Sequence, residues 1–247
     1  MSDLRVTFLG SGDAFSAGGR HQAGYLVHAP EGGFLLDCGA MTLMAMKRFG
    51  IDASVIDSIF ISHLHGDHFV GIPFLLLEFH YEQGRKRPLR ITGPPGTEER
   101  IRALIRATYK EFSGEPLPFA LEFSELPPDS PLSCGAVRIE PFRVPHQETE
   151  ISLGCAVEVA GRRIVYSGDT GWTEELITRS HGVDLFICEC CYFETRLPFH
   201  IDYPRLMEHR HRFTAKRMIL THLGREVLAR QGSIEMELAV DGLVVDI

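Results

Sequence analysis

Short apolar runs alternate with glycine-rich or polar turns along the first part of the chain. Runs of this length and pattern, bounded by turn residues, are typical of β-strands. The segment 40–50, "AMTLMAMKRFG", instead spaces its apolar residues as a helix does and ends on Gly50, a residue suited to a helix C-terminus. The predicted strands are residues 4–9, 25–28, 34–37 and 58–61, with "PEGG" as the hairpin turn between the second and the third.

The same alternation continues to the C-terminus. A long helix is predicted from Asp67 through "FVGIPFLLLEFHYEQG", and another from Thr97 to Phe112, where Thr97 and the acidic residues after it suit a helix start. Two final strands flank the Asp-Gly pair at 241–242, which predicts a second hairpin. The other predicted elements are strands at 89–94, 183–188 and 217–222, helices at 171–180 and 203–213, and mostly strands and turns over 117–167.

This order of elements predicts a fold class. Strands that alternate with helices, with hairpins at both ends, indicate two sheets packed face to face with helices outside, a four-layer α/β arrangement. The proline-rich segment 124–135 is the best candidate for a linker, but it is more simply a connection between two strands. We therefore expect residues 1–247 to form one domain, because single α/β domains of ~200–250 residues are common.

The composition indicates the cellular location of the protein and the state of its cysteines. No apolar run approaches the ~18 residues of a membrane span, and the N-terminus lacks the charged start and long apolar segment of a signal peptide. We expect a cytoplasmic protein without a membrane partner. Six cysteines are too sparse for a disulfide scaffold in a chain of this length. The "CECC" segment at 188–191 follows an apolar run, so buried thiols are the simpler interpretation, and a redox or metal role is the alternative.

The net charge bears on possible partners. The chain carries a formal charge of −8 and has a sequence pI near 5.8, whereas nucleic-acid-binding proteins usually present a basic face. One dense basic cluster, "EQGRKRPLR" at 82–90, is most simply a solvated loop. A polynucleotide partner is disfavoured, although this loop could guide one.

Residues 61–72, "ISHLHGDHFVGI", place three histidines and an aspartate within six positions after an apolar strand. Loops that follow strands are where α/β folds place functional sites, and imidazole with carboxylate suits zinc, manganese or iron. His63 and His65 can point to one side of an extended segment. Asp67 and His68 stand at a helix start and can face a second centre. The sequence therefore predicts ligands for two neighbouring ions rather than a solvated polar turn.

The motif His-x-His-x-Asp-His resembles that of the metallo-β-lactamase-fold hydrolases. Further motifs extend the resemblance over nearly the whole chain: "RVPHQ" contains His146, "VYSGDTG" contains Asp169, and "MILTHLG" contains His222. Each of these follows a strand-like apolar run, as the family pattern requires. The resemblance implies a four-layer αββα sandwich, which the order of elements also predicts.

The resemblance implies a centre of two divalent metal ions, with zinc as the first expectation and manganese or iron as alternatives. Such ions lower the pKa of a shared water toward ~7 and supply a nucleophile at neutral pH. Their charge exceeds that of the ligand aspartates and a hydroxide, so the inner site is positive and favours a small anionic substrate. The implied ligands are His63, His65 and His146 for the first ion, Asp67, His68 and His222 for the second, and Asp169 between them.

Other stretches, such as "LRVTFLGSGDAFS", "FLLDCG" and "YSGDTGW", look most like the ribonuclease Z branch of phosphodiesterases. Similar proteins place a glutamate and a histidine where Glu189 and His200 stand, and that histidine protonates the leaving oxygen. An alkoxide is a poor leaving group, so a general acid helps, and a carboxylate partner keeps a histidine cationic. The resemblance implies Asp67, Glu189 and His200 as catalytic residues. Without it, His200 would read as a surface histidine near Pro198.

The sequence departs from ribonuclease Z in two places. Only 23 positions separate His146 from Asp169, which leaves no room for the long tRNA-binding arm of that branch. The His-Glu-Ala-Thr stretch of the family reads Cys-Glu-Cys-Cys here, at 188–191. Processing of tRNA precursors is therefore doubtful. Shorter relatives without the arm include cyclic-phosphate phosphodiesterases, some with a cysteine-rich metal site near the N-terminus, but this chain has no cysteine before Cys38.

Several functions stay open at this point. The first is a dinuclear metal-dependent phosphodiesterase acting on a small or cyclic phosphodiester. The alternatives are a hydrolase of a carbonyl substrate (a lactone, thioester or β-lactam), a ribonuclease Z-like RNA-processing enzyme, and a metal- or RNA-binding module without activity. The full set of ligands argues against the last. Similar proteins are often homodimers, so a homodimer is expected.

Overall fold

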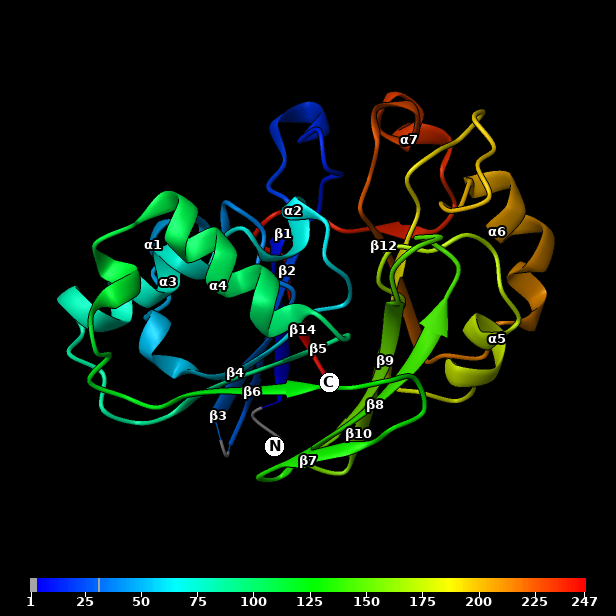
Figure 1. Ribbon diagram of the computed structural model, residues 1–247. Coiled ribbons are helices and arrows are strands. Elements are labelled where there is room, and N and C mark those ends of the chain that lie inside the picture. Colours follow the sequence, from blue (N-terminus) through cyan, green and yellow to red (C-terminus); the bar gives the residue numbers. More distant parts are fainter. Residues whose placement is uncertain (1–3, 31) are drawn as a thin grey trace.

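The computed structural model describes residues 4–30 and 32–247, and two mixed β-sheets face each other at its centre (Figure 1). Each sheet has seven strands. In spatial order, the first sheet contains β14 (Val244–Asp246), β1 (Arg5–Gly10), β2 (Gly24–Ala29), β3 (Gly32–Leu36), β4 (Ile56–Phe60), β5 (Leu89–Gly93) and β6 (Leu121–Glu125). The second contains β13 (Glu237–Leu238), β12 (Arg217–Thr221), β11 (Leu185–Glu189), β10 (Arg162–Tyr166), β9 (Ser152–Val159), β8 (Val137–Val144) and β7 (Leu132–Cys134).

Helices cover the outer face of each sheet. In Figure 1, α1, α3 and α4 lie beside the first sheet, and α5 and α6 beside the second, so the predicted four-layer αββα sandwich is confirmed. The helices are α1 (Thr42–Arg48), α2 (Gly66–Phe69), α3 (Ile72–Leu77), α4 (Thr97–Thr108), α5 (Glu175–Arg179), α6 (Tyr203–His209) and α7 (Arg225–Ala229). Shorter turns are the 3-10 segments η1 (Ala17–Gly19), η2 (Ala53–Val55), η4 (Phe112–Gly114), η5 (Arg210–Arg212) and η6 (Gln231–Ser233), and the π-type turn η3 (Glu78–Glu82).

The apolar residues divide into three buried clusters that match the layers. One fills the space between the two sheets and includes Phe8, Phe60 and Tyr166. The other two lie between each sheet and its helices. Helix α4 shows the cause, since Ile101 and Ile105 are four residues apart and both are buried against the first sheet. Among the described residues, no helix is long and apolar enough to cross a bilayer.

The strand directions bring several loops to one edge of the sandwich. Strands β10, β11 and β12 are parallel, and β8 has the same direction because β9 is antiparallel to both β8 and β10. In the first sheet, β3, β4 and β5 are parallel. The two sheets meet at this edge, where Leu153 N–H donates to the carbonyl of Ser62 at 2.9 Å. Residues that follow β4, β8, β10 and β12 therefore lie close together.

The prediction of one continuous helix after Asp67 is wrong. The structure divides it into α2, α3 and η3. The break falls at Gly71, where a Cβ atom would lie 2.2 Å from the carbonyl oxygen of Gly39, and Pro73 then stands in the first turn of α3. Helix α4 likewise ends at Thr108, before the predicted Phe112.

The hairpin predicted around Asp241 and Gly242 is wrong. β13 pairs with β12 in the second sheet, whereas β14 pairs with β1 in the first, so the chain crosses between sheets at this point. The Asp241 carboxylate accepts hydrogen bonds from the N–H groups of Ser11 at 3.0 Å and His21 at 2.8 Å, which ties the crossing to the loop after β1. For the N-terminal hairpin, β2 and β3 do pair antiparallel, while Glu31 of the expected turn lies outside the described residues.

We expect the stability of the second sheet to depend on pH through Asp184. Its carboxylate accepts hydrogen bonds from Lys216 Nζ at 2.8 Å, Arg163 N–H at 2.9 Å and Arg162 Nη1 at 3.1 Å. Burial alone would raise the pKa of Asp184, but these partners outweigh it and lower that pKa. The stabilisation is therefore complete above the ordinary aspartate pKa of ~3.9 and is lost as the pH falls through the lower folded value.

Replacing Asp184 by Asn should lower the free energy of unfolding at pH 7 by about 1 kcal/mol, since the group is partly exposed. The difference from the unmodified chain should shrink toward zero near pH 2. Urea unfolding at both pH values measures this. Asp246→Asn, in an exposed position of β14, is the control and should change little at either pH. An Asp184→Asn deficit that persists unchanged in acid would contradict the prediction.

Candidate metal centre

The histidine-rich segment begins where β4 ends. Leu64 is buried in the apolar cluster under the first sheet, so its neighbours His63 and His65 turn the other way, toward the gap between the sheet edges. Helix α2 starts at Gly66, and its first turn carries Asp67 and the fully buried His68. His65 is exposed, so the cluster is open to solvent on that side.

Three imidazoles form the first half of the cluster. One nitrogen each of His63, His65 and His146 lies within 4.8 Å of the other two. His146 follows β8 and reaches across from the second sheet, so that its Nε2 lies 2.9 Å from Nδ1 of His65. Three imidazole donors in this arrangement can hold one divalent ion.

The second half of the cluster contains two carboxylates. One donor atom each of Asp67, His68, Asp169 and His222 lies within 4.8 Å of the others. The Oδ2 atom of Asp169 is 3.3 Å from His68 Nε2 and 3.2 Å from His222 Nε2. The same oxygen is 3.9 Å from His63 Nε2 and 4.0 Å from His146 Nε2, so Asp169 faces both halves. The structure thus brings together all seven candidate ligands that the family resemblance implies.

Several atoms in the cluster fit a bound cation better than any protein partner. His63 Nε2, His68 Nε2, Asp67 Oδ2 and Asp169 Oδ1 are buried, and none has a hydrogen-bond partner among the residues that the structure describes. Buried polar atoms are nearly always satisfied, because leaving them unpaired is costly. A pair of divalent ions would satisfy these atoms, and the nitrogen and oxygen donor set suits zinc, manganese or iron.

The protonation states also suit metal binding. Burial lowers the pKa of His63 well below its ordinary value and that of His146 to about 4, so both rings are neutral at neutral pH. Burial alone would raise the pKa of Asp67, but the charge of His68 outweighs it and lowers that pKa to about 2. At neutral pH, His63 and His146 are therefore neutral and Asp67 is ionised, which are the forms that bind metals.

Asp37, at the end of β3, supports the cluster from behind. Its fully buried carboxylate accepts hydrogen bonds of 2.7 Å from the Ser62 N–H, the Ser62 hydroxyl, His68 Nδ1 and the Tyr166 hydroxyl. With Nδ1 donating to Asp37, the ring of His68 presents Nε2 to the cluster. Asp37 belongs to the stretch "FLLDCG" that supports the family resemblance, but the sequence alone predicts no role for it. Its signal was an acidic residue directly after a fully apolar strand.

Glu189 and His200 form a pair beside the cluster. Glu189, at the end of β11, is fully buried, and its Oε1 lies 2.9 Å from His200 Nδ1 and accepts the N–H of Thr170 at 2.6 Å. Burial alone would lower the pKa of His200, but the charge and hydrogen bond of Glu189 outweigh it and raise that pKa to about 9. The His200 ring centre is 4.8 Å from that of His146. A cationic imidazole therefore stands next to the candidate ligands.

The cysteines of the "CECC" segment are buried thiols. Cys188 and Cys190 belong to the apolar cluster between the second sheet and its helices. The Cys191 sulfur differs, because it lies within 4.8 Å of ligand atoms of His200 and His222. The simpler interpretation of the segment holds for the first two thiols, while Cys191 borders the site.

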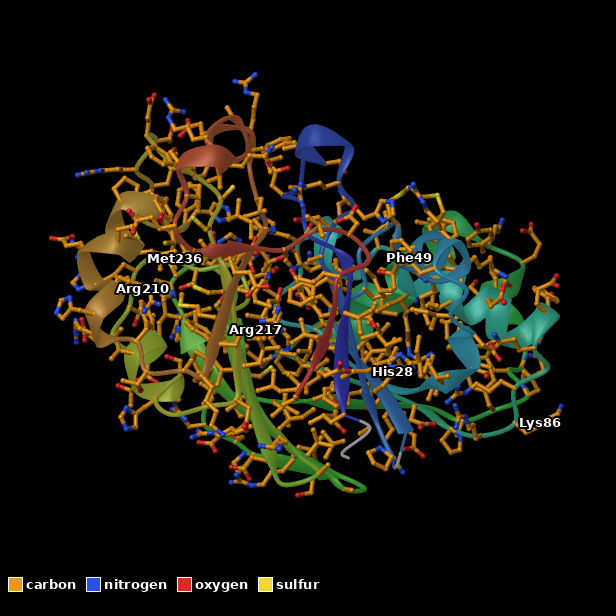
Figure 2. The ribbon with its side chains drawn as sticks, turned by 180° about the vertical axis from the view of Figure 1, so that it is seen from behind. His28, Phe49, Lys86, Arg210, Arg217 and Met236 are labelled. Carbon is orange, nitrogen blue, oxygen red and sulfur yellow. The ribbon has the colours of Figure 1, made fainter. Side chains whose placement is uncertain are left out.

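The basic cluster at 82–90 lies away from the candidate metal centre. It precedes β5, so it stands at the opposite edge of the first sheet, and Figure 2 shows Lys86 at the lower rim of the molecule. The guanidinium of Arg85 is engaged by three carbonyl groups, and Arg87 pairs with Asp57 at 2.8 Å. The idea that this loop guides a polyanion to the site is not supported by this placement.

Comparison with known proteins identifies the family. The family model described as "Anti-Pycsar protein Apyc1" matches residues 4–242. The chain belongs to the anti-Pycsar protein Apyc1 family. It is also similar to ribonuclease Z of Haloarcula marismortui, with 30% identity over 237 residues that cover 78% of this chain and 76% of that one.

Solved structures of other proteins are similar to this Apyc1-family chain over nearly its whole length. The short form of human tRNase Z superposes with a TM-score of 0.81 at 27% identity and covers 98% of this chain and 99% of that one. A diphosphatase of the PhnP family superposes with a TM-score of 0.79 at 20% identity, covering 99% and 98%, which shows a shared fold. The chain is a metal-dependent hydrolase of the metallo-β-lactamase fold, similar to ribonuclease Z, as the sequence resemblance implied.

Replacing Asp37 by Asn should destabilise this Apyc1-family protein strongly. The Asn amide keeps the shape but presents an N–H₂ group to several buried donors. We expect the free energy of unfolding to fall by about 3 kcal/mol, because buried partners lose their acceptor. Urea unfolding of the metal-free protein measures the change. Asp129→Asn, at a largely exposed carboxylate, is the control. A loss for Asp37→Asn no larger than that of the control would show that the network is unimportant.

Proposed function

We propose that the chain is a dinuclear metal-dependent phosphodiesterase that acts on a small or cyclic phosphodiester. The observation that carries the proposal is the Glu189–His200 pair beside the ligand cluster. Donor atoms of His146, Asp169 and His200 lie within 4.8 Å of one another, so the His200 imidazole can reach a substrate held at the cluster. Such a pair suits departure of an alkoxide, which needs a proton.

In this proposal, His63, His65 and His146 hold one ion, Asp67, His68 and His222 hold the other, and Asp169 lies between them. When bound, two divalent ions would supply an activated hydroxide and charge stabilisation for a phosphoryl group. The charge of two divalent ions would exceed that of Asp67, Asp169 and a hydroxide, so the site would keep a small positive charge and favour a substrate anion. The identity of the metal, with zinc as first choice, belongs to the proposal.

In this proposal, His200, Glu189 and Asp67 have separate roles in proton transfer. His200 is held through Nδ1 by Glu189, so its Nε2 is the atom that would donate a proton to the leaving oxygen. Glu189 keeps His200 cationic and fixes its ring, and the Thr170 and Ile201 N–H groups fix Glu189 in turn. Asp67, ionised at neutral pH, would accept a hydrogen bond from the attacking water and orient it.

The proposed substrate is small for structural reasons. Strands β8, β9 and β10 follow one another as a compact antiparallel meander, without an inserted arm between His146 and Asp169. The chain has a net charge of −8, and its densest basic segment lies at the opposite edge from the cluster. A long polyanion would meet an acidic exterior, whereas a small phosphodiester would not. The names of the similar proteins, ribonuclease Z and a PhnP-family diphosphatase, favour phosphoester chemistry.

The purified protein should contain about two equivalents of zinc, manganese or iron and should hydrolyse bis(p-nitrophenyl) phosphate. Chelation should abolish turnover, and adding the metal back should restore it. His65→Ala should lose about one equivalent and at least 100-fold in kcat/KM. Elemental analysis and a p-nitrophenol assay measure these outcomes.

The control for this experiment is His211→Ala, at an exposed histidine outside the cluster, which should keep both metal and activity. Absence of metal after reconstitution would overturn the assignment of the centre. Two equivalents of metal without phosphodiester turnover would move the proposal to the carbonyl alternative, to be tested with lactones, thioesters and β-lactams.

His200→Ala should lower kcat by an amount that depends on the leaving group of the substrate. A 2′,3′-cyclic nucleotide releases an alkoxide and should lose about 100-fold or more in kcat, because general acids contribute ~10²–10⁴. Bis(p-nitrophenyl) phosphate releases p-nitrophenolate, which needs no proton, so its kcat should change only a few-fold. Steady-state kinetics with both substrates at saturating metal measure the ratio. Equal losses on both would remove His200 from the role of general acid.

A further inference from the structure

A glutamate on α7 holds the loop that carries His200. The Glu226 Oε2 atom accepts hydrogen bonds from three consecutive backbone N–H groups, of Phe193 at 3.0 Å, Glu194 at 2.7 Å and Thr195 at 3.0 Å. Its Oε1 atom accepts the Thr195 hydroxyl at 2.6 Å. One side chain thus satisfies four donors of a segment that contains no long helix or strand.

The held loop, residues 192–200, reaches the candidate centre at two points. It ends at His200, which pairs with Glu189. The carbonyl of Phe199, one residue earlier, accepts Nδ1 of the candidate ligand His146 at 2.8 Å. The loop closes on itself through two isolated bridges, between Tyr192 and Asp202 and between Leu197 and His200. Residues 193–195 are therefore connected through the loop backbone to contacts with both His200 and His146.

The position of Glu226 along the chain connects this loop to the cluster. His222, another candidate ligand, lies four residues before Glu226, and the N–H of Leu223 between them donates to the Ser11 carbonyl at 3.0 Å. The segment that presents His222 therefore also carries the acceptor for the loop. One short segment therefore contacts both the loop that ends at His200 and, through Leu223, the loop after β1.

We propose that Glu226 is a positioning residue for the general acid His200 and that it aligns the 192–200 loop with the metal ligands. This inference rests on the proposed function, because it gives His200 the role of acid. Glu226 touches none of the reacting groups and acts through the loop backbone. Arg230, the residue after α7, makes a second contact with the loop: it pairs with Glu194, and its guanidinium lies 4.8 Å from the centre of the Phe193 ring.

The kinetic test compares leaving groups. Glu226→Ala and Glu226→Gln should lower kcat for a 2′,3′-cyclic nucleotide by about 10- to 100-fold at saturating metal, while kcat for bis(p-nitrophenyl) phosphate falls no more than about threefold. Gln keeps the size of Glu but presents an N–H₂ group to backbone N–H donors. It should therefore not restore the ratio of kcat for the cyclic nucleotide to kcat for bis(p-nitrophenyl) phosphate. Thr195→Val removes only the hydroxyl contact and should shift the ratio less. Glu237→Gln is the matched control and should not shift this ratio, because Glu237 forms an exposed ion pair with Arg217, which is labelled in Figure 2.

A second readout needs no turnover. Arg196 is exposed in the middle of the loop, so trypsin can cut there once the loop opens. The folded protein is digested with trypsin, and mass spectrometry of the fragments gives the rate of cleavage after Arg196. This rate should be at least about fivefold higher in Glu226→Ala than in Glu237→Gln. Cleavage at sites outside the loop should be equal in the two variants, which separates loop opening from global unfolding.

The outcomes distinguish this inference from the proposed function. If the unmodified protein hydrolyses neither phosphodiester, the proposed function fails, and unchanged trypsin cleavage in Glu226→Ala would overturn the loop anchor independently. If His200→Ala shifts the leaving-group ratio and Glu226→Ala does not, the positioning role is wrong although the function stands. Equal losses on both substrates in Glu226→Ala would likewise overturn positioning in favour of a general structural role.

Discussion

The buried carboxylate of Asp37 is the interaction on which the rest of the site depends. It joins three elements that are far apart in the sequence: the end of β3, the metal-type loop after β4 and, through Tyr166, the end of β10 in the other sheet. Each partner donates a hydrogen, so the fully buried carboxylate is their shared acceptor. The gap between the two sheet edges, and with it the spacing of the ligands, is fixed around this one side chain.

Much of this arrangement could be predicted from the sequence because its causes are local. Apolar runs indicated the strands, the family resemblance implied His63, Asp169 and His222 as ligands after them, and the strand directions of the structure bring these residues together. The errors came from non-local causes. Asp241-Gly242 has the local signature of a hairpin, yet its side chain bonds to Ser11, which is 230 residues away in sequence. The break at Gly71 is set by the carbonyl of Gly39, a contact that no local pattern contains.

The pKa values of His68, His63 and His200 are shifted differently, so the site contains three electrostatic environments. Around His68, burial alone would lower the pKa, but Asp169, Asp67 and Asp37 raise it well above its ordinary value, so this region favours positive charge. A few ångströms away, burial dominates at His63 and keeps that ring neutral. His200, beside Glu189, is a separate cationic centre. Fixed charges arranged in this way need no reorganisation when a charged group binds, which is how pre-organised sites gain their strength.

The spacing of the candidate ligands along the chain has a consequence for folding. His63, His65, Asp67 and His68 lie within six residues, whereas His146, Asp169 and His222 join them only when both sheets have assembled. If these residues bind metal as proposed, the ions would find four of their ligands in the short segment even in the unfolded chain and would gain the remaining ligands as the two sheets assemble. Ligand binding to the unfolded state reduces the stabilisation that a metal gives the folded one. Such cations would bind before folding is complete, and the folding of the two sheets would then complete their coordination.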